Sequence, residues 1–247
     1  RGFVAVEPSL YEVVEQAVEF SRRSGGRFDV TIAPLLRAWK DAHDAGRQPS
    51  AREIADLRRC VGYRHIEVRP PNEIRFRSDC LALDLGGIGK GYAVDRAIAV
   101  LESAGIRHAV VNAGGSTIGA IGAPPGLDGW PVELGAPVSG HRTLLLRDEA
   151  VSTSQQRLRR LPFAPGAFGE IIDPRREAPI EHETSISVVT PSATSADALS
   201  TTLLLMPVQN GKQLLAQFSP VSALWFSPAG ELRDSFRPSR LRLADLQ

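Results

Sequence analysis

A glycine-rich turn followed by a helical pattern is the stretch of this 247-residue sequence that first suggests chemistry. Gly86, Gly87, Gly89 and Gly91 fall within six positions, and the apolar spacing after them predicts a helix that ends at Gly105. Glycine permits positive φ and lets a ligand approach bare amides. The start of a helix presents unpaired N–H groups and a partial positive charge. The turn therefore predicts a site for a phosphate or pyrophosphate.

Neither of the two common phosphate motifs describes this turn. A P-loop needs Gly-x4-Gly-Lys followed by Ser or Thr, whereas Gly91 follows Lys90 here. The dinucleotide fingerprint Gly-x-Gly-x-x-Gly fails because Gly87, Gly89 and Gly91 are spaced by two throughout. Packing of a helix against a strand is the competing interpretation of the glycines. Lys90 fits both interpretations, as a partner of phosphate or as a solvated side chain.

A carboxylate and a hydroxyl lie one helical turn apart in a second predicted helix. Asp197 and Thr201 are at i and i+4, so their side chains share one face. Such oxygen atoms suit Mg²⁺ in an open site that backbone, water and substrate phosphates complete. In the structural alternative, Ser195 caps the helix, Asp197 complements its dipole and Thr201 packs. The local sequence leaves both interpretations open.

The composition excludes several broad classes of protein. With 29 basic and 28 acidic side chains, the chain has no net field that favours nucleic acid. No apolar run approaches the length that a membrane span needs. Cys60 and Cys80 cannot form a disulfide framework and show no metal-ligand spacing. Because both lie beside apolar residues, we expect buried free thiols.

Helical and strand patterns alternate along the chain without a regular βαβ repeat. This pattern predicts an α+β fold with mixed or antiparallel sheets, in one domain over residues 1–247. Capping boxes open the predicted helices at Ser9 and Ser50. Helices are expected at 9–25, 50–62, 92–104, 195–205 and 208–218, with a short one opening at Pro34, and a polar loop at 41–49. Strands are expected at 28–32, 65–68, 73–76, 80–83, 109–112, 185–190, 224–226 and 231–233.

Four stretches in this order resemble the ApbE family of flavin transferases. They are Phe28-Asp29-Val30-Thr31 with Pro34, Leu35 and Trp39; residues 84–95; Ile171-Ile172-Asp173-Pro174; and residues 191–201. The resemblance covers the chain from its first helix onward. The segment that precedes this helix in the family, which contacts the flavin ring, is not among the 247 residues. We therefore expect a chain that is N-terminally truncated relative to the family.

The resemblance implies an enzyme that binds FAD and, with Mg²⁺, moves the FMN half onto a Thr or Ser hydroxyl of an acceptor protein, releasing AMP. It implies that the metal is held by the backbone carbonyl of Gly89 and by the side chains of Asp197 and Thr201. Asp197 thereby also counts as a catalytic residue. The FAD contacts that the resemblance implies are Arg27, Phe28, Asp29, Gly86, Tyr92 and Ile172.

Three positions depart from the family pattern. Glu170 stands where the family usually has a His proposed as the general base, and a carboxylate with a raised pKa is chemically able to replace it. Ser116 stands in place of the Asp of a Gly-Gly-Asp stretch, and Gln155 in place of the Gly of Thr-Ser-Gly. These departures keep two alternatives open: a non-catalytic or weakly active FAD-binding relative, and an FAD pyrophosphatase that yields FMN and AMP.

The resemblance also implies where the protein works and what it meets. Family members usually act outside the cytoplasmic membrane, often through a lipid anchor, so we expect a periplasmic or cell-envelope location with membrane anchoring through an N-terminal segment. The expected partner is an acceptor flavoprotein. No role with nucleic acid is expected.

Overall fold

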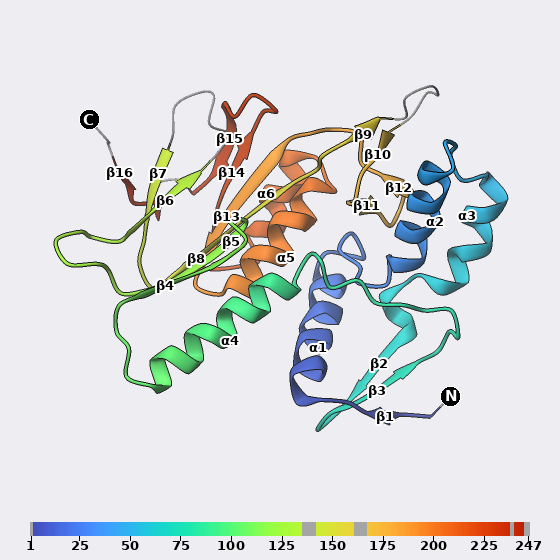
Figure 1. Ribbon diagram of the computed structural model, residues 1–247, viewed down its shortest axis with the longest axis horizontal. Coiled ribbons are helices and arrows are strands. Elements are labelled where there is room, and N and C mark those ends of the chain that lie inside the picture. The colour runs from blue at the N-terminus through green and yellow to red at the C-terminus, as the bar shows by residue number, and fades with distance from the viewer. Residues whose placement is uncertain (1, 135–141, 161–166, 238–239, 245–247) are drawn as a thin grey trace. The chain divides into compact units, whose positions relative to one another are not determined.

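The computed structural model describes residues 2–134, 142–160, 167–237 and 240–244 (Figure 1). The chain divides into two compact units. Unit 1 comprises Arg1–Leu85 and Gln156–His182, and unit 2 comprises Gly86–Gln155 and Glu183–Gln247. Helices and antiparallel sheets occur in both, which confirms the expected α+β fold. Within the described ranges, no helix is long and apolar enough to cross a membrane.

Unit 1 combines helices with short antiparallel strands. Its main sheet has the order β1-β3-β2, and two further strand pairs, β9 with β10 and β11 with β12, follow later in the chain. The elements are α1 (Pro8–Arg23), α2 (Ala33–Asp44), α3 (Ala51–Leu57), the 3₁₀ turns η1 (Arg58–Cys60) and η2 (Tyr63–His65), β1 (Val4–Ala5), β2 (Ile66–Arg69), β3 (Glu73–Phe76), β9 (Arg159–Arg160), β10 (Ala167–Phe168), β11 (Ile172–Asp173) and β12 (Ala178–Pro179).

Local sequence signals set the starts of the unit 1 helices. Helix α1 begins at Pro8, whose missing N–H costs nothing at this position, so the predicted cap at Ser9 is wrong although the helix is confirmed. At α3 the predicted capping box is confirmed: the Ser50 hydroxyl accepts from the N–H of Glu53, and the Glu53 carboxylate accepts from the N–H of Ser50. The predicted hairpin of β2 and β3 is also confirmed.

Two predicted strands in unit 1 are wrong. Residues 28–32 form a turn, because the Asp29 carboxylate accepts from the N–H of Thr31 (2.8 Å) and from its hydroxyl (2.6 Å). Helix α2 starts directly after this turn and extends through Asp44, into the expected polar loop. Residues 80–83 form no strand: Cys80 belongs to a turn, and just after this stretch the Asp84 N–H donates to the carbonyl of Val30.

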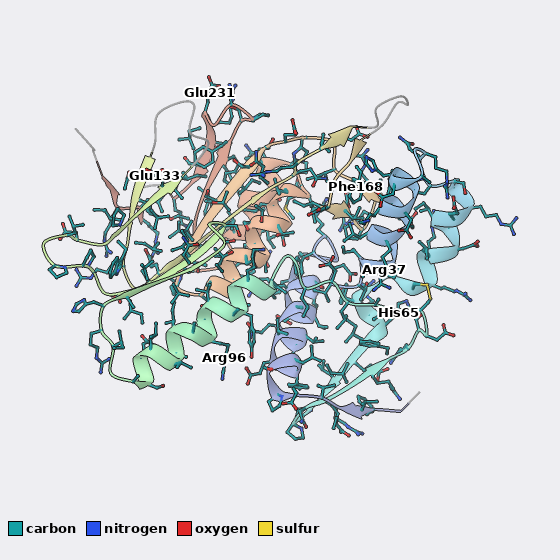
Figure 2. The ribbon with its side chains drawn as sticks, in the orientation of Figure 1. Arg37, His65, Arg96, Glu133, Phe168 and Glu231 are labelled. Carbon is teal, nitrogen blue, oxygen red and sulfur yellow. A yellow bond between two sulfur atoms is a disulfide. The ribbon has the colours of Figure 1, made fainter. Side chains whose placement is uncertain are left out.

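A disulfide joins Cys60 and Cys80, so the expectation of free thiols is wrong. It is the yellow bond in Figure 2. The presence of only two cysteines excludes a framework of several disulfides but not a single one. A single disulfide requires only that the two Cα atoms lie close together, and here they are 5.0 Å apart. The bond fastens η1 to the segment that follows β3.

We expect removal of this disulfide to destabilise the protein by about 3 kcal/mol, because the bridge closes a loop of 20 residues in the unfolded chain. The measurement is urea unfolding of the Cys60→Ser/Cys80→Ser double variant. Dithiothreitol should lower the stability of the unmodified protein toward that of the double variant and leave the variant unchanged. Equal stability of the two proteins under oxidising conditions would contradict the expectation.

A buried glutamine organises the segment that carries Glu170 and Ile172. The Gln156 amide nitrogen donates to the carbonyls of Ile180 (3.1 Å) and Ile171 (3.3 Å), and its oxygen accepts from the N–H of Ile171 (3.0 Å). Gly169 leaves the space for this amide, since a Cβ there would lie 1.8 Å from the Gln156 nitrogen. These bonds hold the stretch that leads into β11.

Unit 2 is built on a six-stranded antiparallel sheet of the described strands, in the order β15-β14-β13-β8-β5-β4. A smaller sheet has the order β16-β7-β6. The elements are α4 (Gly89–Ser103), α5 (Ala193–Leu204), α6 (Val208–Leu215), β4 (Ala109–Ala113), β5 (Thr117–Ile121), β6 (Trp130–Leu134), β7 (Arg142–Leu146), β8 (Ala150–Gln155), β13 (Ser185–Thr190), β14 (Ser222–Phe226), β15 (Leu232–Phe236) and β16 (Leu243–Ala244). The predicted helices and strands of this unit are confirmed within a few residues.

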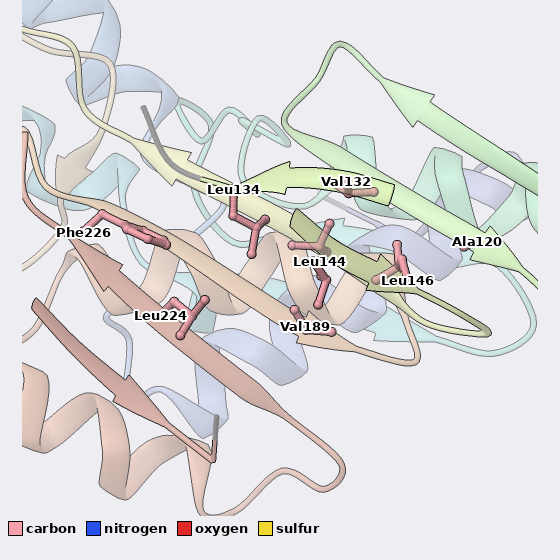
Figure 3. Packing of buried hydrophobic residues seen from close by; sticks show 9 residues of the cluster. Ala120, Val132, Leu134, Leu144, Leu146, Val189, Leu224 and Phe226 are labelled. Carbon is pink, nitrogen blue, oxygen red and sulfur yellow. The ribbon is translucent and has the colours of Figure 1, made fainter. Parts of the chain in front are cut away.

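The large sheet of unit 2 is covered on both faces. Leucine and valine side chains of β6 and β7 pack against β8, β13 and β14 in one apolar cluster (Figure 3). Helix α5 packs on β8 and β13 from the opposite face, and α4 packs on α5, β4 and β5. Every residue of β13 is therefore buried. This arrangement fixes α4 and α5 against each other.

Candidate active site around Asp197

Asp197 lies at a junction of three elements of unit 2. It is on α5 and only 2% exposed. Its Oδ2 accepts from the N–H of Gly91 at the start of α4 (3.0 Å), and its Oδ1 accepts from the hydroxyl of Ser152 on β8 (3.2 Å). The carboxylate thus meets the positive end of α4, where unpaired N–H groups favour an anion.

Strand β8 presents hydroxyls to α5 at the same spacing as the predicted pair on the helix. Ser152 contacts Asp197, and two residues on, the Ser154 hydroxyl lies 3.1 Å from that of Thr201. Two strand residues rise about 6.6 Å and four helix residues about 6 Å, so the two pairs align. The structure therefore brings Asp197 and Thr201 onto one polar seam of α5, as their spacing predicts.

A lysine faces the buried carboxylate. Lys90 Nζ lies 3.9 Å from Asp197 Oδ1 and donates to the carbonyl of Gly86 at 3.1 Å. Burial raises the pKa of Asp197, whereas the charge of Lys90, the N–H of Gly91 and the hydroxyl of Ser152 act in the opposite direction.

Helices α4 and α5 cap each other's N-termini. While Asp197 of α5 accepts from α4, Asp95 of α4 accepts four hydrogen bonds from the start of α5. Its donors are the hydroxyl of Ser192, the N–H of Ala193, and both the N–H and the hydroxyl of Thr194, at 2.6 to 2.9 Å. Ser192 itself is the N-cap residue, so the predicted Ser195 cap is wrong.

We expect Asp95→Ala to lower the free energy of unfolding by about 2 kcal/mol, because it leaves several donors at the start of α5 without their acceptor. Urea unfolding monitored by circular dichroism measures this loss. Glu102→Ala, which removes an exposed acid from the last turn of the same helix, should change stability by no more than about 0.5 kcal/mol. Equal effects of the two substitutions would contradict the capping role.

The donor set at this junction suits a hard cation. Its oxygens belong to a carboxylate and hydroxyls, which Mg²⁺ prefers, and the Asp197 carboxylate has lone-pair capacity beyond the hydrogen bonds that it accepts from Gly91, Ser152 and the N–H of Lys90. Among the described residues there is no cluster of three or more His, Cys, Asp or Glu that could hold a metal. A metal here would thus need backbone, water and substrate oxygens as well.

The other expected residues of unit 2 lie close to this junction in the chain. Gly89 is the first residue of α4, two positions before the Gly91 that donates to Asp197. The Gly86 carbonyl accepts from Lys90, and the N–H of Tyr92 donates to the carbonyl of Ile88 within the first turn. The use of Gly86, Gly89 and Tyr92 by a ligand stays a prediction.

The expected residues of unit 1 lie on two segments. Asp29 is buried, and its second oxygen accepts from the N–H of Tyr63 (2.8 Å); burial raises its pKa, against the hydrogen bonds from Thr31 and Tyr63. Asp29 also lines a cavity of about 420 Å³ within this unit. Phe28 and Ile172 are buried, Arg27 is partly buried and Glu170 is exposed. Their contacts with FAD stay predictions.

Sequence reasoning missed several residues that build the junction. Ser152, Thr153 and Ser154 are consecutive hydroxyl residues of β8, and the first and third, which share one face of the strand, contact α5; this run of hydroxyls was the available signal. Asp95 and Ser192 lie 97 positions apart, and Gly91 and Asp197 lie 106 apart, so no local pattern connects them.

Comparison with known proteins identifies the family. The sequence model of the ApbE family matches residues 1–225. An FAD:protein FMN transferase of Treponema pallidum is 29% identical, covering 94% of this chain and 69% of that protein. One of Klebsiella pneumoniae is 24% identical, covering 86% of this chain and 63% of that protein. This chain is thus shorter than both relatives.

Solved structures agree with this match. The apo form of the flavinyl transferase ApbE of Pseudomonas stutzeri has a TM-score of 0.79 at 27% identity, covering 95% of this chain and 74% of that one. The ApbE protein of Thermotoga maritima has a TM-score of 0.78 at 26% identity, covering 94% of this chain and 77% of that one.

Proposed function

Because this chain belongs to the ApbE family of transferase enzymes, we propose that it transfers FMN from FAD to a Thr or Ser hydroxyl of an acceptor protein, with Mg²⁺, and releases AMP. The observation that carries the proposal is the buried Asp197 carboxylate at the start of α4, with Thr201 one turn further along α5. These oxygens suit a cation that serves a pyrophosphate.

In the proposed reaction the acceptor hydroxyl oxygen bonds to the FMN phosphorus, and the bond from that phosphorus to the bridging oxygen breaks, so that AMP leaves. We assign the hydroxyl proton to Glu170, which stands at the position of the family base. Asp197, Thr201 and the Gly89 carbonyl would hold Mg²⁺, which when bound neutralises charge that develops on the phosphates. Contacts of FAD with Arg27, Phe28, Asp29, Gly86, Tyr92 and Ile172 belong to the same proposal.

One assay distinguishes this proposal from its alternatives. AMP is measured after FAD and Mg²⁺ are added, with and without an acceptor protein that contains a target Thr or Ser. AMP with covalent flavin only in the presence of acceptor supports the transferase. AMP without acceptor indicates an FAD pyrophosphatase, and FAD binding without AMP indicates an inactive relative, which the departures at Ser116, Gln155 and Glu170 allow.

We also propose that the protein works in the periplasm or cell envelope, with an N-terminal anchor. The Cys60–Cys80 disulfide supports this location, because such bonds persist in oxidising compartments and are rare in the cytosol. Cell fractionation with an antibody against the chain tests the proposal. Recovery with cytoplasmic marker enzymes would contradict it.

A further inference from the structure

Lys90 occupies a position that a helix does not favour for a cation. It is the second residue of α4, where the helix dipole is positive and repels an ammonium group. Its side chain is 44% exposed, yet Nζ donates to the carbonyl of Gly86 and lies 3.9 Å from the Asp197 carboxylate. The oxygens of Gly86 and Asp197, both in the candidate site, therefore offset the repulsion between the helix dipole and the ammonium group.

The Asp197 carboxylate, in turn, needs a positive neighbour. It is only 2% exposed, and a buried carboxylate without a counter-charge is costly. Its other described partners carry no charge: they are the N–H of Gly91, the hydroxyl of Ser152 and the backbone N–H of Lys90 itself. The ammonium group is thus the cationic partner of this carboxylate in the metal-free protein, and it lies beside Oδ1, whose lone pairs a metal ion would need.

We propose that Lys90 is a positioning residue of this site, whose ammonium group holds the Asp197 carboxylate in the metal-free protein and competes with a divalent cation for it. The inference rests on the metal site of the proposed function. A cation that binds Asp197 must take over the role of the ammonium group, so loss of Lys90 makes binding of the cation easier and makes the metal-free protein less stable.

The test is calorimetric titration of Mn²⁺ alone, without nucleotide, into the full chain and its variants. We expect Lys90→Met, which keeps the length of the side chain and removes its charge, to bind Mn²⁺ about tenfold more tightly than the unmodified protein. Lys212→Met is the matched control, because it removes the Lys212–Asp234 ion pair (2.6 Å) of α6 and should leave Mn²⁺ affinity unchanged. Adding Asp197→Asn to Lys90→Met should abolish the tight binding.

Thermal unfolding supplies a second readout. Without metal, Lys90→Met should melt below the unmodified protein, and saturating Mn²⁺ should close that gap, whereas the deficit of Lys212→Met should persist. Lys90→Gln replaces Lys90→Met if the latter does not fold. Unchanged or weaker Mn²⁺ binding by the Lys90 variant, with normal binding by the unmodified protein, overturns the inference and leaves the proposed function standing. If neither protein binds Mn²⁺, the metal site of the proposed function fails, and the inference with it.

Discussion

Replacing Asp197 with asparagine should reduce the rate of AMP release from FAD by about 10²–10³-fold without unfolding the protein. The carboxylate is the buried charge at the start of α4, and in the proposed reaction it holds the cation that faces the pyrophosphate. Asparagine keeps one oxygen that accepts from the N–H of Gly91, so the cap on α4 survives. The substitution removes the negative charge and the oxygen that accepts from the Ser152 hydroxyl.

Asp197 is proposed to serve both catalysis and stability, and a control variant separates the two effects. Asp234→Asn is the control, because it removes another Asp of unit 2 that pairs with a lysine, on β15. It should retain AMP release within about twofold, and both variants should unfold at urea concentrations near that of the unmodified protein. Wild-type rates of AMP release from Asp197→Asn would remove the basis for a catalytic role of this carboxylate.

Gly91→Ala should destabilise the protein by about 3 kcal/mol or more, the largest effect on stability that we expect from a single methyl group. A Cβ at this position would lie 2.2 Å from the carbonyl oxygen of Ala193 and 2.7 Å from Cα of Thr194. Both are backbone atoms at the start of α5, so no side chain can rotate to relieve the overlap. The two helices would have to separate at the point where Asp197 meets α4.

Gly211→Ala is the graded control for this prediction, since it also adds a methyl group to a helical glycine of unit 2. There the nearest atom is the flexible end of Leu203, at 2.8 Å, and alanine gains about 1 kcal/mol of helix propensity. We expect its free energy of unfolding to stay within about 1 kcal/mol of the unmodified protein. Urea unfolding compares the two variants, and a Gly91→Ala protein as stable as Gly211→Ala would show that the close approach of α4 and α5 is not required.

Most elements of the fold could be predicted from local pattern. The spacing of apolar residues was sufficient to predict helices α4 and α5, and the capping box at Ser50 is formed as predicted. Both signals depend on residues only a few positions apart, so they can be found in the sequence. The strand expected at 28–32 failed because a single side chain, Asp29, satisfies nearby donors and turns the chain. Its bond to the N–H of Tyr63, 34 positions away, has no local signature.

Some features of the candidate site could likewise be predicted from local sequence, and others depend on tertiary packing. The shared face of Asp197 and Thr201 follows from helical spacing, and β8 supplies the hydroxyls that meet both residues. The contact of Gly91 with Asp197 depends instead on how α4 crosses α5, which the tertiary packing decides. For the same reason, pairing of Cys60 with Cys80 followed from the placement of η1 and could not be inferred from the cysteine count.

Because α4 and α5 cap each other, the atoms proposed to bind a cation are the same atoms that stabilise the fold of this helix pair. The carboxylate that would coordinate a cation is also the group that completes the first turn of α4, and α4 in turn supplies the carboxylate that completes α5. Any change that moves Asp197 therefore affects the N-termini of both helices. If Asp197 holds a cation as proposed, binding of the cation and the stability of this helix pair are thermodynamically linked, and we expect a bound cation to stabilise the α4–α5 pair.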